Sequence, residues 1–387
     1  MARVVGIIAE YNPFHSGHAR QIAHIREEGE ARVVAVMSGN FVQRGEAALF
    51  DKYVRAKAAL SCGVDLVVEL PFPYACARAR DFAAMGVKAL EALGCVEELC
   101  FGAERADLGL LCRAAAALDN PAVGEETRRL GAQGLTYARA RRLALEKVLG
   151  EGAALFDGPN NTLAVEYLRA LAHSGSPIQP RALPREGAGH GSLRPEGGTA
   201  SGQALRGMHR AGEGWGGLVP PAALACYRGQ PGSLRERGEA AALWQLRQMK
   251  RGDFAALPDV SEGLENRLWE AAGVCTGMAD FLARVKTKRY PLARLRRILL
   301  HALLGVKRED FTFSLPYLKV LGFTEEGKAL LGRGKVPTLS KGVKIEALSE
   351  EAARLHRQAA RATDFFSLLA PVPRAKGEEY RGKIVKV

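Results

Sequence analysis

The chain has 387 residues, of which 47% are hydrophobic and 25% are charged, and its 55 lysines and arginines exceed its 42 aspartates and glutamates by 13. These values are typical of a globular protein, and no apolar run reaches transmembrane length, which argues against a membrane protein and predicts a cytoplasmic one. The positive charge favours a polyanionic partner such as RNA or DNA, although an arginine-rich composition can also follow from genomic base content. The seven cysteines are scattered without a C-x-x-C pair, which favours reduced thiols and argues against a metal site.

The first half of the chain alternates strand and helix patterns. Short β-branched apolar runs predict strands at residues 3–9, 32–39, 64–71 and 96–104. Amphipathic segments between them predict helices at residues 17–29, 51–63 and 81–94. Apolar strands separated by helices are typical of a parallel sheet buried on both faces, so we expect a doubly wound α/β sheet of the Rossmann type. In such sheets, ligands bind beyond the carboxyl ends of the strands.

The rest of the chain is predicted to be mainly helical. Helices are expected from residue 107 to 173, and a long loop rich in glycine, proline and arginine follows at 178–202. A helix from Ser201 to His209 completes the α/β part, and residues 214–233 are expected to be a connector. Residues 235–370 are expected to be all-helical, and a loosely held tail follows them.

The stretch EYNPFHSGH, residues 10–18, follows the first predicted strand directly. Pro13 prevents the strand from continuing, and Gly17 removes a Cβ where a helix begins. His15 and His18 flank this helix start, where unpaired backbone N–H groups favour anions. The two imidazoles can donate hydrogen bonds to phosphate oxygens as charge develops during attack on an α-phosphate. The alternative is a pair of turn and helix residues bonded to the backbone, but the position after the first strand favours the functional interpretation.

With the strand before it, HSGH resembles the signature of the HIGH-type nucleotidyltransferase superfamily. Further blocks resemble one family within it, the tRNA(Met) cytidine acetate ligases; they are GIIAEYNPFHSGH, MSGNFVQRGE, DLVVELPF, FGAE, PNNTLAVEYLRAL, LPREGAGH and KTKRYPLARLRRILLHALLG. The resemblance implies an enzyme that joins ATP and acetate into acetyl-adenylate, releases pyrophosphate, and transfers the acetyl group to N4 of the wobble cytidine of elongator tRNA(Met). Mg²⁺ is expected to arrive with the ATP phosphates, and no protein metal site is expected.

The resemblance also implies which residues bind ATP. They are Ile8, Ala9, Glu10, Tyr11, Asn12, Pro13, Phe14, His15, Ser16, Gly17, His18, Ala19, Arg20, Gln21, Gly102, Asn160 and Arg185, with His15 and His18 as the catalytic residues. Gly102 lacks a Cβ and can let a nucleotide approach the backbone, or it is a turn glycine. Asn160 begins a helix, where asparagine is usually a cap, and Asn161 can exchange roles with it. Arg185 lies in the predicted loop, where its guanidinium either binds phosphate oxygens or is solvated.

The segment SGQALR, residues 201–206, is expected beside the same crevice. It lies where members of the superfamily hold the triphosphate with a hydroxyl group and a helix N-terminus. Gln203 and Leu205 depart from that pattern. Arg206 is a candidate triphosphate contact, and the alternative is an ordinary arginine on the surface of a helix.

The segment after the second strand is also expected to reach this crevice. Asn40, Gln43 and Arg44 are expected to face it and to bind acetate or order the nucleotide, while Asp51 is expected to cap the next helix. Residues 75–83, ACARARDFA, depart from the family pattern. This departure leaves the acyl specificity open.

The segment KTKRYPLARLRRILLHALLG combines a buried stripe with basic residues. The stripe consists of Leu295, Ile298, Leu299, Ala302 and Leu303. The residues expected to bind the phosphates of tRNA are Lys286, Lys288, Arg289, Arg294 and Arg297, with His301 on the same face. The alternative is a solvated basic face.

These patterns divide the chain into two expected domains. Residues 1–215 are predicted to form a nucleotidyltransferase-like, ATP-binding catalytic domain, and residues 216–387 a helical, basic, tRNA-binding domain. Two other functions are left open. A small-molecule adenylyltransferase would not need the basic helical half, and a catalytically inactive RNA-binding relative would not turn over ATP. The sequence indicates no oligomeric state.

Overall fold

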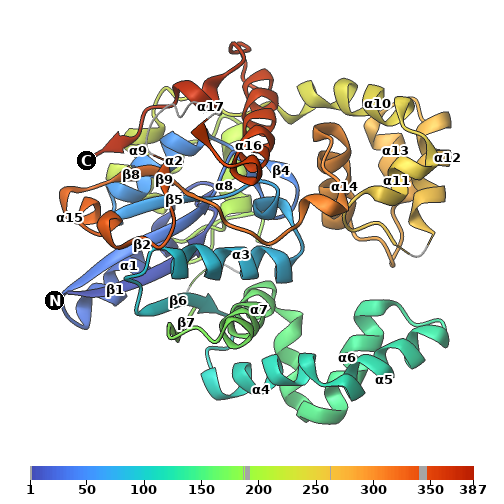
Figure 1. Ribbon diagram of the computed structural model, residues 1–387, viewed down its shortest axis with the longest axis horizontal. Coiled ribbons are helices and arrows are strands. Elements are labelled where there is room, and N and C mark those ends of the chain that lie inside the picture. Colours follow the sequence, from blue (N-terminus) through green and yellow to red (C-terminus); the bar gives the residue numbers. More distant parts are fainter. Residues whose placement is uncertain (1, 186, 188–191, 262, 340–346) are drawn as a thin grey trace.

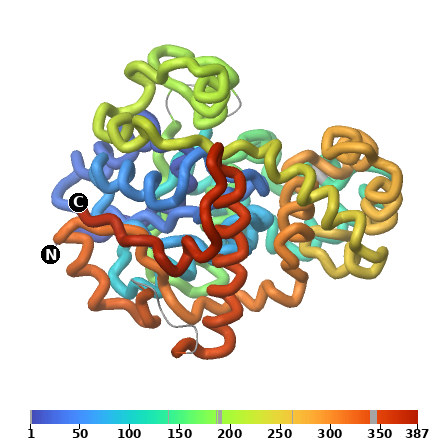
Figure 2. Tube along the Cα trace, turned by 90° about the horizontal axis from the view of Figure 1, so that it is seen from above, coloured from blue at the N-terminus to red at the C-terminus, as the bar shows by residue number. Residues whose placement is uncertain are grey.

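A central sheet carries helices on both faces, and two helical lobes lie beyond one of its ends (Figures 1 and 2). The computed structural model describes residues 2–185, 187, 192–261, 263–339 and 347–387. The first lobe consists of α4 (Leu108–Asp119), α5 (Pro121–Ala132) and α6 (Tyr137–Leu149). The second lobe consists of α10 (Glu239–Gln248), α11 (Arg251–Ala256), α12 (Leu264–Val274), α13 (Met278–Val285) and α14 (Leu292–Leu304). No helix among the described residues is long and apolar enough to cross a membrane.

The sheet has the strand order β10–β8–β5–β2–β1–β6–β7, and β9 pairs with β8. The bounds are β1 Arg3–Ala9, β2 Ala31–Ser38, β5 Leu66–Leu70, β6 Glu98–Ala103, β7 Gln179–Pro184, β8 Leu318–Phe323, β9 Thr338–Leu339 and β10 Val385–Lys386. The five neighbouring strands β5, β2, β1, β6 and β7 are parallel. Gly6 of β1 lies opposite Val34 of β2 and Leu99 of β6. The order runs outward in both directions from β1 and β6, so a crevice opens between the carboxyl ends of these two strands.

Two hydrophobic cores sandwich the sheet because alternate residues of each strand point to opposite faces. Val34 and Val36 of β2 pack on one face, together with α3 (Ala79–Ala92), α7 (Pro159–Ser174) and α16 (Glu350–Leu368). Val33 and Ala35 pack on the other face, together with α1 (Ser16–Glu27), α2 (Lys52–Leu60), α8 (Gly202–Arg210) and α9 (Pro221–Tyr227). The second lobe has a core of its own, which includes Phe254 and Phe281.

The predicted α/β part is confirmed in its main elements. The expected strands are β1, β2, β5 and β6, and the helices between them are α1, α2 and α3. The helices expected between residues 107 and 173 are α4 to α7, and the helix expected from Ser201 is α8. A hairpin of β3 (Phe41–Val42) and β4 (Glu46–Ala47) follows β2 and was not predicted.

The expectation of an unstructured loop at residues 178–202 is wrong at its start, because Gln179–Pro184 form β7. This strand pairs with β6 alone and lies at the edge of the sheet. Prolines are tolerated at such an edge, where one side of the strand makes no ladder hydrogen bonds. Pro180 and Pro184, with a partly exposed Arg181, therefore hide the strand from a pattern that relies on alternating apolar residues.

The chain beyond residue 214 also departs from the prediction. The expected connector contains α9, and the segment expected to be all-helical contains β8 and β9. β8 runs antiparallel to β5, so the chain returns to the central sheet after building the second lobe. The division of the chain at residues 215 and 216 stays a prediction.

The C-terminal segment is held by charges and is not a loose tail. Here α17 (Glu378–Arg381) places Glu379 in the interior, where its carboxylate lies 2.7 Å from the ammonium of Lys52 and also contacts Lys319. Lys52 in turn lies 2.7 Å from Glu69 of β5. Burial disfavours all of these charges, but the two nearby carboxylates raise the pKa of Lys52. The buried cluster of Lys52, Glu69, Lys319 and Glu379 therefore ties the last helix to the sheet.

Candidate active site

The loop after β1 is fixed from several directions before α1 begins. Oδ1 of the Asn12 side chain accepts a hydrogen bond from Leu49 N at 2.7 Å, and the main-chain carbonyl of Asn12 accepts one from Arg206 Nη1 at 2.7 Å. Phe14 N donates to the hydroxyl group of the buried Tyr227 at 2.9 Å. Since Tyr227 belongs to α9, the segment predicted to be a connector helps to shape this loop.

His15 and His18 form a stacked pair at the N-terminus of α1. Their ring centroids lie 3.8 Å apart, with an angle of 27° between the planes. His15 is the N-cap of α1, and its Nδ1 accepts a hydrogen bond from Gly17 N at 3.1 Å, while His15 N donates to Nδ1 of His18 at 3.2 Å. A Cβ on Gly17 would lie 3.0 Å from Cε1 of His15, which explains why glycine occupies this position.

The hydrogen bonds also define the protonation state of both rings. Burial lowers the pKa of His15 to about 3 and the pKa of His18 well below its usual value, so both rings are neutral near pH 7. Because each Nδ1 accepts a backbone N–H, each neutral ring carries its proton on Nε2. The backbone-bonded interpretation therefore holds for one nitrogen of each ring, and the other nitrogen is a donor that a bound oxyanion can use.

Three arginines surround the histidine pair with positive charge. Arg185, Arg20 and Arg206 each lie close enough to His15 to lower its pKa further. Arg206 extends from α8, whose N-cap Ser201 accepts a hydrogen bond from Ala204 N at 3.0 Å. The structure thus brings Arg20, Arg185 and Arg206, which were predicted from three separate segments, to one site.

Arg185 follows β7 and is oriented by the start of α7. Its Nη1 donates to Oδ1 of Asn160 at 3.2 Å, and its Cγ lies 3.2 Å from where a Cβ on Gly102 would be. Gly102 therefore leaves room for the stem of this arginine. Asn161 is buried, and its Oδ1 accepts a hydrogen bond from Arg105 N at 3.2 Å. Of the two asparagines, Asn160 is the one that contacts Arg185.

Glu104, which was not among the predicted site residues, directly follows β6. Its carboxylate accepts hydrogen bonds from Asn161 N at 2.7 Å and from Asn160 N at 3.1 Å, and thereby occupies the N-terminus of α7. It also accepts one from Nδ2 of Asn160 at 2.5 Å, which fixes the amide that orients Arg185. These bonds hold the pKa of Glu104 below its usual value despite its partial burial. The signals in the sequence were its place at the carboxyl end of a predicted strand and in the block FGAE, which resembles the family.

The segment after β2 reaches the site through Gln43. Gln43 N donates to Glu10 Oε1 at 3.0 Å, and its side chain donates to the carbonyl of Ala77 at 2.9 Å. Burial raises the pKa of Glu10, while the Gln43 bond and the charges of nearby arginines, Arg44 among them, oppose this rise. Arg44 is exposed at the end of the β3–β4 hairpin.

Asn40 does not face the crevice, and the prediction for it is wrong. Its side chain is buried, accepts a hydrogen bond from Lys52 N at 2.9 Å, and donates to Thr363 Oγ1 at 3.4 Å. The expected cap at Asp51 is confirmed by a hydrogen bond from Tyr53 N at 2.8 Å. Asn40 therefore connects the end of β2 to α2 and α16.

The buried side chain of Arg55 connects the loops after β1 and β2 through hydrogen bonds. Its guanidinium is fully buried and donates to the carbonyls of Glu10 at 2.6 Å and Ser38 at 3.1 Å, and also to that of Gly39. A fourth bond, of 3.0 Å, goes to the carbonyl of Phe50. Three of these carbonyls, those of Glu10, Ser38 and Gly39, lie at or just after the ends of β1 and β2, so Arg55 fixes both loops at the crevice.

The expected basic face of α14 is wrong for two of its members. Arg297 is buried and pairs with Asp259 at 2.8 Å, and His301 is buried with its pKa lowered to about 4. Arg294 is partly buried and donates to the carbonyl of Asp259 at 3.0 Å. The reason is that the Asp259 segment and Phe72 cover this face of α14, which was predicted to be available to tRNA. Before α14, Lys286, Lys288 and Arg289 are exposed.

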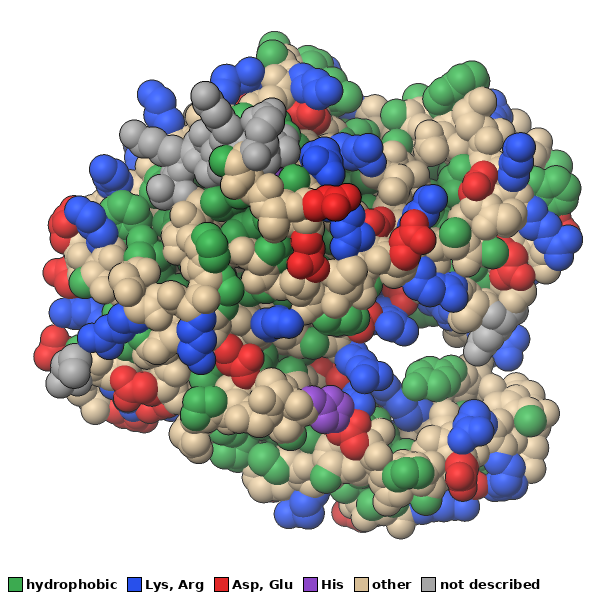
Figure 3. Space-filling view, viewed as in Figure 1, with side chains coloured by type: hydrophobic (Ala, Val, Ile, Leu, Met, Phe, Trp, Pro, Cys, Tyr) green, Lys and Arg blue, Asp and Glu red, His purple; other side chains and the backbone are tan. Residues whose placement is uncertain are grey.

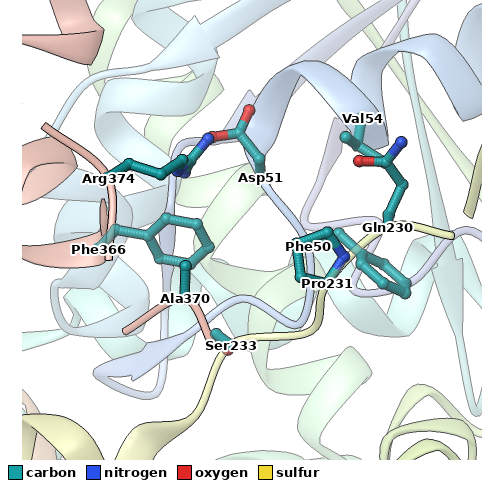
Figure 4. A pocket seen from close by; sticks show the side chains of 9 residues that line it. All are labelled: Phe50, Asp51, Val54, Gln230, Pro231, Ser233, Phe366, Ala370 and Arg374. Atoms are coloured by element: carbon teal, nitrogen blue, oxygen red, sulfur yellow. The ribbon is translucent and has the colours of Figure 1, made fainter. Parts of the chain in front are cut away.

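A small cavity of about 120 Å³ lies between the start of α2, the end of α16 and residues 230–233 (Figure 4). Its wall includes Asp51 and Arg374, which form an ion pair at 3.3 Å. The cavity is smaller than the several hundred Å³ typical of ligand sites. None of the predicted ATP-binding residues lines it.

Comparison with known proteins identifies relatives along the whole chain. A family model described as HIGH Nucleotidyl Transferase matches residues 2–380. A tRNA(Met) cytidine acetate ligase from Syntrophotalea carbinolica is 41% identical over 347 residues, which cover 86% of this chain and 82% of that protein. Another from Caldanaerobacter subterraneus subsp. tengcongensis is 37% identical over 94% of each chain.

Solved structures agree with these relatives. The crystal structure of Thermotoga maritima TmcAL in its apo form superimposes with a TM-score of 0.91 and 29% identity, and covers 100% of both chains. The structure of Thermotoga maritima TmcAL bound with alpha-thio ATP gives a TM-score of 0.89 and 28% identity over 99% of both chains. This chain therefore belongs to the HIGH nucleotidyl transferase family and, within it, to the family of the tRNA(Met) cytidine acetate ligases.

Proposed function

We propose that this chain is an ATP-dependent ligase that activates acetate as acetyl-adenylate and transfers the acetyl group to N4 of the wobble cytidine of elongator tRNA(Met). The observation that carries the proposal is the stacked pair of neutral histidines with three arginines around it. A triphosphate needs this combination of fixed donors and positive charge. The relatives named tRNA(Met) cytidine acetate ligase and the neighbour that binds alpha-thio ATP support the choice of substrates.

In the first step, a carboxylate oxygen of acetate attacks the α-phosphorus of ATP, the bond to the β-phosphate oxygen breaks, and pyrophosphate leaves. The Nε2–H groups of His15 and His18 donate to the α-phosphate oxygens as negative charge builds on them. Arg185 and Arg206 neutralise the departing pyrophosphate, since a planar guanidinium matches phosphate oxygens. Acetate is already ionised near pH 7, so no general base is required in this step.

In the second step, the N4 amine of cytidine attacks the acetyl carbonyl, the bond to AMP breaks, and the amine loses a proton. The mixed anhydride is reactive enough that positioning of the amine provides much of the rate. We assign ATP binding to the residues from Ile8 to Gln21 together with Gly102, Asn160 and Arg185. Asn160 acts here by holding Arg185.

Magnesium fits this site only as a companion of the substrate. Among the described residues, no group of three or more His, Cys, Asp or Glu side chains could hold a metal ion. The histidines use their Nδ1 atoms for backbone bonds, and Glu104 is bonded to the start of α7. We therefore propose that Mg²⁺ is bound by the ATP phosphates and water, where it would offset phosphate charge.

The acceptor RNA is proposed to reach the crevice from the side of the two lobes. The net charge of +13 favours RNA, and Lys286, Lys288 and Arg289 are exposed cations of the second lobe. Arg294 and Arg297 contribute less surface because their guanidinium groups are bonded to the Asp259 segment. RNA binding should weaken steeply with salt, and a slope near zero would count against this surface.

Acetate-dependent exchange of pyrophosphate into ATP, measured with and without tRNA, tests the proposed function. The ligase should exchange label only when acetate is present, whether or not tRNA is added. A small-molecule adenylyltransferase would not depend on acetate, and an inactive RNA-binding relative would show no exchange. Formation of N4-acetylcytidine in tRNA(Met), followed by mass spectrometry, then tests the second step.

A further inference from the structure

Tyr137 is an exposed aromatic residue at the first position of α6, with 61% of its surface accessible. Its helix belongs to the first lobe, which faces the second lobe across an open gap (Figure 3). Lysine and arginine side chains line both sides of this gap (Figure 3). The exposed Tyr137 ring therefore belongs to a lobe that borders a basic gap.

The guanidinium group of Arg141 packs over the ring of Tyr137. The guanidinium carbon of Arg141 lies 5.8 Å from the centroid of the Tyr137 ring and 5.4 Å from that of the Phe156 ring. Thr136 caps α6 through a hydrogen bond from Arg139 N at 3.4 Å. The ring is therefore held by the helix and by Arg141, while most of its area stays available to a planar partner.

Tyr137 lies near Arg78, whose neighbour Ala77 is bonded to the segment that reaches the crevice. Burial opposes the charge of Arg78, but the hydrogen bond to Asp81 and the charges of Asp81 and Asp259 raise its pKa, and the Tyr137 phenol group is near enough to add a smaller contribution. Arg78 follows Ala77, whose carbonyl accepts the hydrogen bond from Gln43, and Gln43 N is bonded to Glu10 in the loop after β1. The side chain of Arg78 is exposed, and its Nε lies 2.9 Å from the carboxylate of Asp81.

We propose that Tyr137 is the platform on which a nucleobase of the single-stranded acceptor RNA stacks, with Arg141 beside the ring and the Arg78 side chain next to the RNA backbone. This inference rests on the proposed function and adds the recognition of an unpaired base beside the crevice. Sequence-specific enzymes that act on RNA loops hold splayed bases on aromatic and guanidinium planes. An exposed tyrosine that an arginine supports, on the lobe that borders the basic gap, provides such a plane.

The test uses the full chain with Tyr137 replaced by Phe, Trp or Leu. Phe and Trp keep an aromatic face, whereas Leu keeps only apolar bulk. An anticodon stem-loop with 2-aminopurine next to the wobble cytidine reports stacking by loss of fluorescence. We expect quenching with the wild type and with Y137F and Y137W, and recovery of the fluorescence with Y137L. The affinity for the stem-loop should fall roughly tenfold in Y137L, the effect of losing one stacked base.

Two further measurements separate stacking from other effects. Acetate-dependent pyrophosphate exchange without tRNA should be unchanged in Y137L, while KM for tRNA rises. Trp244 of α10, also exposed, is the matched control, and W244L should keep the quenching and the affinity. Wild-type affinity and quenching in Y137L, or an equal loss in W244L, would overturn the assignment. Because the fluorescence is read without ATP and acetate, it still decides the platform if the exchange reaction fails.

Discussion

The rings of His15 and His18 stack at 3.8 Å, and both Nδ1 atoms are bonded to backbone N–H groups at the start of α1. The same residues that cap the helix therefore present their Nε2–H groups to the crevice. One local structure determines the tautomer, the charge and the position of both donors. His15 therefore has two roles, since it caps α1 through Nδ1 and donates to the substrate through Nε2–H.

Replacement of His15 by Asn should divide these roles. The Asn side chain keeps an oxygen that can cap α1 but loses the Nε2–H donor, so the exchange rate should fall by about 10²- to 10³-fold at little cost in stability. His15→Ala should lose the rate to a similar extent and also about 1 kcal/mol of stability. Exchange assays and thermal unfolding of the two variants check this. A variant His15→Asn that exchanges at the wild-type rate would exclude His15 from catalysis.

Arg185 should contribute to ATP binding through its guanidinium. Arg185→Ala is expected to raise KM for ATP about tenfold or more, because a charge-assisted bond to phosphate is lost. Arg181 is a matched control, since it lies in β7 and pairs with Glu28 and Glu98 away from the histidines. Arg181→Ala should leave KM for ATP unchanged. Similar KM values for ATP in both variants would contradict the proposed role.

Stability should depend on pH through the buried His301. Burial lowers its pKa to about 4, and neither ring nitrogen has a hydrogen-bond partner among the described residues. In the unfolded chain its pKa is about 6.5, so between pH 6.5 and 4 the unfolded state binds more protons and stability falls as the pH decreases. His301→Leu removes this effect. The free energy of unfolding of the variant minus that of the wild type should therefore be about 2 kcal/mol larger at pH 5 than at pH 7.

Thermal unfolding of the wild type and of His301→Leu at pH 5 and pH 7 measures this difference. The substitution also changes packing against Phe72, whose ring centroid lies 6.3 Å from that of His301, but this contribution is common to both pH values. If the stability difference between His301→Leu and the wild type is the same at pH 5 and pH 7, His301 gains its proton as easily in the folded protein as in the unfolded chain.

The buried charge cluster should make Lys52 important for stability. Among the residues that the structure describes, Lys52→Met leaves Glu69 with one more distant cation, Lys319 at 3.9 Å, and is expected to cost about 3–5 kcal/mol. Lys57 on the same helix is exposed, and Lys57→Met should change stability by less than about 0.5 kcal/mol. Urea unfolding of both variants checks the difference. If both variants unfold at the same urea concentration, the cluster does not stabilise the protein.

Sequence patterns predicted the part of the fold in which local signals and tertiary structure agree. Runs such as Val33–Met37 are fully buried between two helical layers, so their composition alone indicates a central strand. The histidine turn was predictable because Pro13 and Gly17 mark the end of the strand and the start of the helix. The expected carboxyl-end position then brought His15 and Gly102 to one crevice, whereas Arg185 was indicated by the family resemblance alone.

The rest depended on contacts that a linear pattern does not contain. β8 is a strand because β5 offers it an open edge, a fact that is invisible in residues 318–323 themselves. Arg297 and His301 lie one helical turn apart on a face that looks basic, but Asp259 from another segment covers it. The role of Glu104 likewise depends on α7, which begins more than fifty residues later in the chain, so only the fold reveals it.

The antiparallel pairing of β5 with β8 has a consequence for synthesis on the ribosome. Until the segment around residue 320 has emerged, β5 exposes an unpaired edge of apolar residues, and the first half of the protein is prone to aggregate. The carboxylate of Glu379 arrives later still. A nascent chain that stalls between residues 320 and 379 would thus carry the histidine turn on a sheet to which α17 is not yet anchored.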